Sequence, residues 1–118
     1  IIKDLKLVIP LLFYCLRARD IDTCEWIISL MSNDSDRREL INATDSFGCT
    51  TFLSACKGGY MASLQWLLTH KLFDQKFVFK ADKNGLNAIH YTCFAKTAEA
   101  ETCLDKVLSL FKENGKGN

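Results

Sequence analysis

The sequence predicts an all-α domain built as a stack of helix-turn-helix repeats. One apolar helix face, with residues at positions i, i+3 and i+4, recurs three times within 118 residues. One turn signal also stands before two of the expected helix pairs. Because an amphipathic helix pair exposes a face that only a neighbouring pair can cover, we expect the pairs to stack in one curved layer.

The apolar faces set the repeat length. Trp26 and Trp66 stand at the same place in the first two faces, which gives an offset of 40 residues, and the turn signals at Asp45 and Asp82 give 37. The chain is therefore expected to form a single domain over residues 1–118, with units at 1–42, 43–80 and 81–112. Because it opens on Ile1 in a hydrophobic stretch, we expect it to be part of a longer protein. The three faces consist of Cys24, Ile27 and Ile28; Leu64, Leu67 and Leu68; and Leu104, Val107 and Leu108.

The turn signal is the most specific feature. Residues 45–50 read DSFGCT and residues 82–87 read DKNGLN, so each has an Asp followed three residues later by a Gly. The Asp carboxylate accepts hydrogen bonds from amides of its own turn, and Gly adopts a positive φ that costs other residues about 1 to 2 kcal/mol. Thr50 and Asn87 then stand where helix-starting side chains cap the free amides.

Two connections between the helices are long. Residues 32–39 are polar and charged, and we expect them to form a solvated loop. Residues 71–80 differ, because they contain Leu72, Phe73, Phe77, Val78 and Phe79. These side chains either pack beneath their loop against the second and third units or form an exposed aromatic ledge for a partner.

Residues 45–70 resemble the ankyrin repeat, whose pattern runs D-x-x-G-x-T-P-L-H-x-A-A-x-x-G-H into an apolar helix. Residues 82–108 are similar but looser, and residues 8–31 share only the helix spacing, without the turn. Thr51 replaces the usual Pro and Leu53 the usual His, whereas the third unit keeps His90, which the family uses to tie neighbouring loops. The third unit lacks a Gly between its helices, so we expect a longer inter-helix loop there. The resemblance implies an ankyrin-type solenoid.

Composition and motifs argue against several other classes of function. The 15 basic and 14 acidic residues leave no basic footprint for nucleic acid. The longest apolar run, residues 7–16, contains Pro10 and is shorter than the roughly 20 residues that cross a bilayer. Clustered Cys and His spacing for a metal is absent, as is a Gly-rich phosphate loop. Only His70 and His90 could orient a nucleophile, so we expect no enzyme activity, cofactor or small-molecule substrate. Glu99 and Glu101 are two residues apart and would point to different helix faces, so we expect them to be solvated.

The six cysteines are interpreted as thiols rather than as three disulfides. Cys15, Cys24 and Cys56 fall where helices need apolar side chains, and free Cys is among the most buried residue types. A reduced compartment, the cytoplasm or alternatively the nucleus, is therefore expected. Cys49 stands in a turn and is expected to be the most exposed thiol.

The resemblance also implies where a partner protein would bind. Turn tips and first helices of such repeats line one concave side, and we call the residues there the contact row. Phe47 stands at a turn tip of this row, and Arg17, Lys57 and Lys83 share it. We therefore expect an acidic partner with an apolar anchor. The alternatives are a solvated face, or a structural or regulatory segment attached to an enzyme or channel domain outside this chain. The matching positions are Ser46, Phe47, Cys49, Lys57 and Gly58 in the second unit; Lys83, Asn84, Leu86, Phe94 and Ala95 in the third; and Arg17 and Ala18 by helix alignment.

Overall fold

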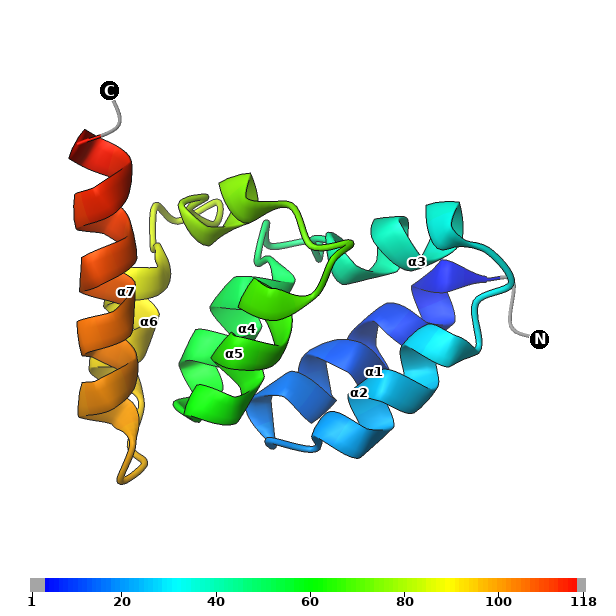
Figure 1. The fold of residues 1–118 in the computed structure, drawn as a ribbon, viewed down its shortest axis with the longest axis horizontal. Coiled ribbons are helices and arrows are strands. Elements are labelled where there is room, and N and C mark those ends of the chain that lie inside the picture. The colour runs from blue at the N-terminus through cyan, green and yellow to red at the C-terminus, as the bar shows by residue number, and fades with distance from the viewer. Residues whose placement is uncertain (1–3, 117–118) are drawn as a thin grey trace.

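Three helix pairs lie side by side and form one curved layer (Figure 1). The computed structural model describes residues 4–116, which contain seven α-helices, one 3-10 turn and no strand beyond an isolated bridge between Thr44 and Thr50. No helix within this range is long and apolar enough to cross a membrane. The prediction of an all-α stack of helix pairs is confirmed. The pairs are α1 (Leu5–Arg17) with α2 (Ile21–Ser29), α4 (Thr51–Gly58) with α5 (Met61–Thr69), and α6 (Ala88–Phe94) with α7 (Ala100–Lys116).

Polar side chains fix where the helices begin. The hydroxyl of Thr50 accepts a hydrogen bond from the amide of Leu53, and the side chain of Asn87 accepts from the amides of Ile89 and His90. Both residues precede their helix in extended backbone, as N-caps do. The prediction that these two residues start helices is confirmed.

The core lies between the helix pairs, with α4 packed between α1 and α6. Burying one large apolar side chain stabilises a fold by about 1.5 to 3 kcal/mol, so such a continuous core accounts for the stacking. Its largest fully buried side chains are Val8, Leu12, Leu16, Ile27, Met31, Leu40, Ile41, Phe52, Leu53, Leu64, Leu67 and Val78.

The third apolar face differs from the prediction. Leu108 is 45% exposed, while Cys103 and Val107 are fully buried and Phe111 is partly buried against the core. The buried face of α7 is thus rotated by one residue relative to the predicted one. A loop at residues 95–99 separates α6 from α7, as the missing Gly predicted, and it frees α7 from the register of the other units.

Residues 32–39 are solvated as predicted, but the prediction that they form a loop is wrong. They contain most of α3 (Asp34–Ile41), which Asn33 caps by accepting a hydrogen bond from the amide of Asp36 at 2.8 Å. Leu40 and Ile41 at its end are fully buried, so two apolar side chains anchor an otherwise polar helix.

The apolar segment at residues 71–80 packs inward. It contains the 3-10 turn η1 (Gln75–Val78), and the ring of Phe73 lies 6.2 Å from that of Phe52. The ring of Phe79 contacts Phe111 of α7 edge-on at 5.0 Å. The packing interpretation is confirmed, and the exposed aromatic ledge is not what the structure has.

Arg19 connects all three helix pairs at the end of the molecule opposite the turns. It follows α1 at a positive φ of 59°, and its guanidinium lies 5.2 Å from the ring centre of Tyr60, before α5. It also lies 3.7 Å from the carboxylate of Glu99, before α7. Glu99 accepts a further hydrogen bond from the amide of Met61, so this residue caps α5 and is not a merely solvated side chain.

Candidate functional site

Each D-x-x-G turn is built around the carboxylate of its Asp. One oxygen of Asp45 accepts hydrogen bonds from the amides of Phe47 and Cys49, both at 2.9 Å. Gly48 supplies the positive φ of 77° that closes the turn. The predicted roles of both residues are confirmed, and the turn presents Phe47 at its tip, where 71% of the residue is exposed.

The second turn repeats this design and adds a side chain. Asp82 accepts from the amides of Asn84 and Leu86 with one oxygen and from the hydroxyl of Tyr91, on α6, with the other. The Tyr91 hydrogen bond holds the pKa of Asp82 below its ordinary value, and the same bond raises the pKa of Tyr91. Asp82 therefore stays ionised, and Tyr91 is fixed over the turn.

The two turns are joined directly. The amide of Lys83 donates a hydrogen bond of 2.9 Å to the carbonyl of Phe47. A Cβ atom on Gly48 would lie 3.1 Å from the amide nitrogen of Lys83, so glycine allows the turns to approach this closely. The turn tips consequently form one rigid row.

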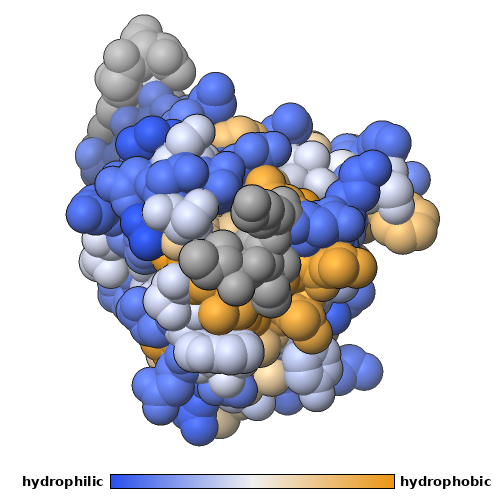
Figure 2. All heavy atoms as spheres, turned by 90° about the vertical axis from the view of Figure 1, so that its right-hand side faces the viewer, coloured by the Kyte–Doolittle hydropathy of each residue, from blue (hydrophilic) through white to orange (hydrophobic). Residues whose placement is uncertain are grey.

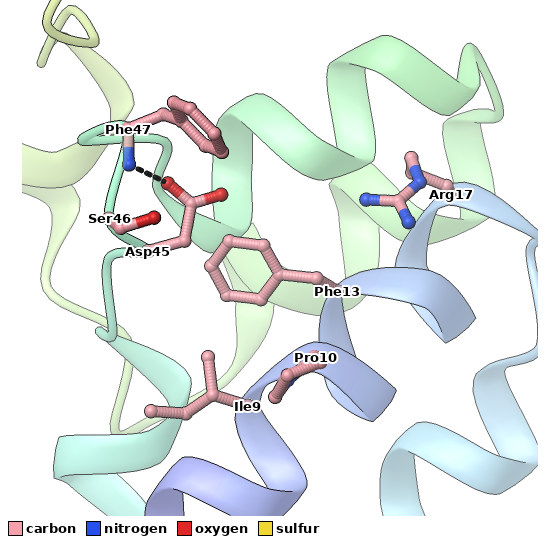
Figure 3. Close-up of a pocket in the computed structure, with 7 residues that line it drawn as sticks. All are labelled: Ile9, Pro10, Phe13, Arg17, Asp45, Ser46 and Phe47. Atoms are coloured by element: carbon pink, nitrogen blue, oxygen red, sulfur yellow. Dashed lines mark hydrogen bonds between the residues drawn. The ribbon is translucent and has the colours of Figure 1, made fainter.

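Two adjacent depressions lie along this row and the first helices, and we call them together the turn groove. The first, of about 250 Å³, lies between α1 and the first turn (Figure 3), and the second, of about 280 Å³, continues toward the second turn. Arg17, Asp45 and Phe47 line both. The first is also lined by Ile9, Pro10, Phe13 and Ser46, and the second by Cys49, Lys57, Asp82, Asn84 and Tyr91.

The groove has an apolar half and a charged half. In Figure 3 the ring of Phe13 points toward the turn that carries Asp45 and Phe47, while Arg17 stands farther along α1. The guanidinium of Arg17 donates to the hydroxyl of Ser54 at 3.2 Å, which fixes its position. Among residues 4–116, neither Arg17 nor Lys57 forms an ion pair with a carboxylate.

The contact row contains acids beside the cations from which an acidic partner was predicted. The carboxylates of Asp45 and Asp82 line the same groove as Arg17 and Lys57, so its formal charges balance. One oxygen of each Asp is occupied by two backbone amides, and the other oxygen of Asp82 is bonded to Tyr91. The sequence signal for these acids was present in the turn motif, where it was assigned only a structural role.

Six of the predicted contact residues line the turn groove: Arg17, Ser46, Phe47, Cys49, Lys57 and Asn84. Lys83, Leu86 and Phe94 do not; Phe94 is 64% exposed at the end of α6. Ile9, Pro10 and Phe13 were missed, because the first unit lacks the turn motif by which the other residues were mapped.

Gly58 has a packing role. A Cβ atom there would lie 2.4 Å from the carbonyl oxygen of Arg17 and 2.7 Å from its Cα, so only glycine allows α4 to lie this close to α1. Gly59, in the left-handed conformation with φ of 76°, ends α4.

Burial raises the pKa values of five thiols of this chain, those of Cys15, Cys24, Cys49, Cys56 and Cys103. Burial, followed by the charges of Asp45 and Asp82, raises the pKa of Cys49 to about 11, and burial raises that of Cys24 to about 12. Such thiols stay protonated near neutral pH, and the thiolate is the nucleophile and metal ligand. Cys93 is exposed and Cys49 only partly so, which corrects the prediction that Cys49 is the most exposed.

Both histidines serve local structure. His90 accepts a hydrogen bond from the amide of Asn87 in a capping box, within its own unit and not between loops as the family pattern implied. His70 accepts from the amide of Leu72 at 3.2 Å. Within the described part of the chain, no three His, Cys, Asp or Glu side chains lie together as a metal site.

Comparison with known proteins gives one family. The family model of ankyrin repeats in many copies matches residues 12–68, which run from α1 to α5. No curated protein and no solved structure matches the chain.

Proposed function

Since residues 12–68 belong to the ankyrin repeat family, whose repeats are generally protein-protein interaction modules, we propose that this chain binds a partner protein in the turn groove. The observation that carries the proposal is the exposure of Phe47 on a turn that its hydrogen bonds hold rigid. Because the backbone that carries this aromatic side chain is already fixed, binding orders only the side chain, and aromatic residues often dominate binding energies.

The lining of the groove supports a partner with an apolar anchor. Phe47 stands opposite Ile9, Pro10 and Phe13 across the first depression, and the four side chains offer an apolar site beside the turn. A partner aliphatic or aromatic side chain that enters there excludes water from Phe47, which contributes most of the affinity.

The charges support an acidic group beside this anchor. Arg17 and Lys57 have no carboxylate partner among the described residues, whereas Asp45 and Asp82 already accept hydrogen bonds from their own turns. A partner carboxylate next to Arg17 is therefore favoured, although the two aspartates reduce the long-range attraction. Electrostatic steering is accordingly weaker than three uncompensated cations would give.

The proposal is tested with peptides selected from a random displayed library on the 118-residue chain. We expect selected peptides to share an apolar residue next to an acidic one, and Phe47→Ala to weaken their binding by about 1 to 3 kcal/mol in calorimetry. Lys57→Glu should lower the association rate and its salt dependence.

Matched controls separate the groove from general stickiness. Phe94→Ala removes an aromatic side chain of similar exposure outside the groove, and Lys80→Glu reverses an exposed charge elsewhere. Both should leave binding unchanged. Equal losses for Phe47→Ala and Phe94→Ala would place the binding site outside the turn groove.

A further inference from the structure

The first helix carries an exposed apolar stripe on the side turned away from α4. Leu7, Leu11 and Tyr14 are 68%, 53% and 62% exposed, and Ala18 continues the row. Their spacing of 4, 3 and 4 residues keeps all of them on one face of a helix, in the pattern of a seam between two packed helices. Figure 2 views the molecule from this end and shows apolar atoms gathered there within a polar surround.

The internal repeat identifies this stripe as a stacking face. The offset of 40 residues places Tyr14 at the position of Ser54 and Trp26 at that of Trp66. In the second unit both positions are buried against the first unit: Ser54 donates to the carbonyl of Phe13, and Trp66 donates to Glu25. In the first unit Trp26 is 59% exposed, so the equivalent face lacks a cover within the described chain.

The size of Leu11 argues against a further repeat as that cover. Its equivalents are Thr51 in the second unit and Ala88 in the third, and both are fully buried beneath a closely stacked neighbour. Thr51 also donates a hydrogen bond to the carbonyl of Ile41, which a leucine cannot replace. The larger side chain of Leu11 therefore prevents a further repeat from stacking as closely as the second and third units do. It is compatible with a helix that packs at the greater distance of side-chain contacts.

We propose that this face pairs with the same face of a second copy of the chain, with α1 packed on α1 around a two-fold axis. An apolar stripe is complementary to itself under such symmetry. The net charge of +1 sets little repulsion between two copies. Leu7, Leu11, Tyr14 and Trp26 expose on the order of 500 Å² per copy, so the interface lies near the lower limit of specific ones and the dimer is weak and reversible.

Sedimentation equilibrium of the 118-residue chain tests this directly. Between about 5 and 500 µM the mean mass should rise from one chain toward two, with a dissociation constant of about 10 to 100 µM. Leu11→Glu should raise that constant at least tenfold, because each copy then carries a negative charge at the centre of its stripe and both charges lie in the interface. Leu108→Glu places the same charge on a leucine of similar exposure on α7 and should change nothing.

Circular dichroism and urea denaturation at low concentration confirm that both variants fold. A wild-type chain that stays monomeric over the whole range overturns the proposal, and so does a dimer that Leu11→Glu leaves intact. A dimer lost with Phe47→Ala instead would place self-association in the turn groove. Because the stripe and the turn groove share no residue, failure here leaves the proposed function standing.

Discussion

Replacing Gly58 with alanine tests whether this position serves packing, as the structure has it, or partner contact, as the sequence predicted. A Cβ atom would meet three backbone atoms of Arg17, the closest at 2.4 Å, and backbone cannot turn aside as a flexible side chain can. Helix α4 must therefore move away from α1. This displacement loosens the contact on which the first and second helix pairs depend.

Two effects of opposite sign decide the magnitude. Alanine favours the helical state over glycine by about 1 kcal/mol. Overpacking costs about 1 to 3 kcal/mol, and a clash with backbone belongs at the upper end of that range. We expect Gly58→Ala to lower the free energy of unfolding by about 1 to 2 kcal/mol.

Urea denaturation followed by circular dichroism measures this effect. With a slope of about 1 to 3 kcal/mol per molar urea, the midpoint should fall by about 1 M. Lys57→Ala changes the adjacent exposed position and should stay within about 0.5 kcal/mol of the wild type. A midpoint for Gly58→Ala at or above that of the wild type would refute the close approach of α4 to α1 and return Gly58 to the contact surface.

Two further predictions concern the core and the pH dependence of stability. Leu67→Ala should lower the free energy of unfolding by about 2 to 5 kcal/mol, because it creates a cavity. Leu108→Ala should lower it by less than about 1 kcal/mol, whereas the predicted face would make it equally costly. The urea midpoints of the two variants measure this difference. Burial lowers the pKa of His70 in the folded state below its ordinary value near 6.5, so the unfolded chain binds the proton more readily. The contribution of His70 to stability should therefore be complete well above that pH and be lost as the pH falls through and below it, because protonation removes the acceptor for the amide of Leu72. His70→Asn keeps an acceptor without the charge and should flatten this dependence; an unchanged slope would assign it to other groups.

Local chemistry made much of the fold predictable. The turns follow from an Asp that binds two amides and a Gly that adopts positive φ, so Asp45, Gly48, Asp82 and Gly85 predicted their own geometry. The apolar faces of the first two units follow from helical spacing. These features depend on residues that are close in the sequence, so a single sequence is enough to predict them.

Features that depend on distant residues were not predictable in this way. Helix α3 contains mostly polar side chains and is held by the burial of Leu40 and Ile41 against the stack, which no local pattern shows. The rotation of α7 depends on how Cys103 and Val107 pack into the core. The loop before α7 does not fix this packing, because its length differs from that of the other units. The apolar wall of the groove was missed for the same reason, since Phe13 reaches it only through the packing of α1 beside the first turn.

The contacts of Arg19 bear on how this stack comes apart. In a solenoid whose units touch only their neighbours, unfolding that begins at one end passes from unit to unit in turn. Here the ion pair with Glu99 links the first unit to the third, and Glu99 also caps α5 of the second. An exposed pair contributes only about 0.2 to 1 kcal/mol, but fraying of the loop before α7 removes both contacts at once. Fraying of this loop is therefore felt by both other units at their inter-helix end, where Arg19 and the start of α5 lose a partner.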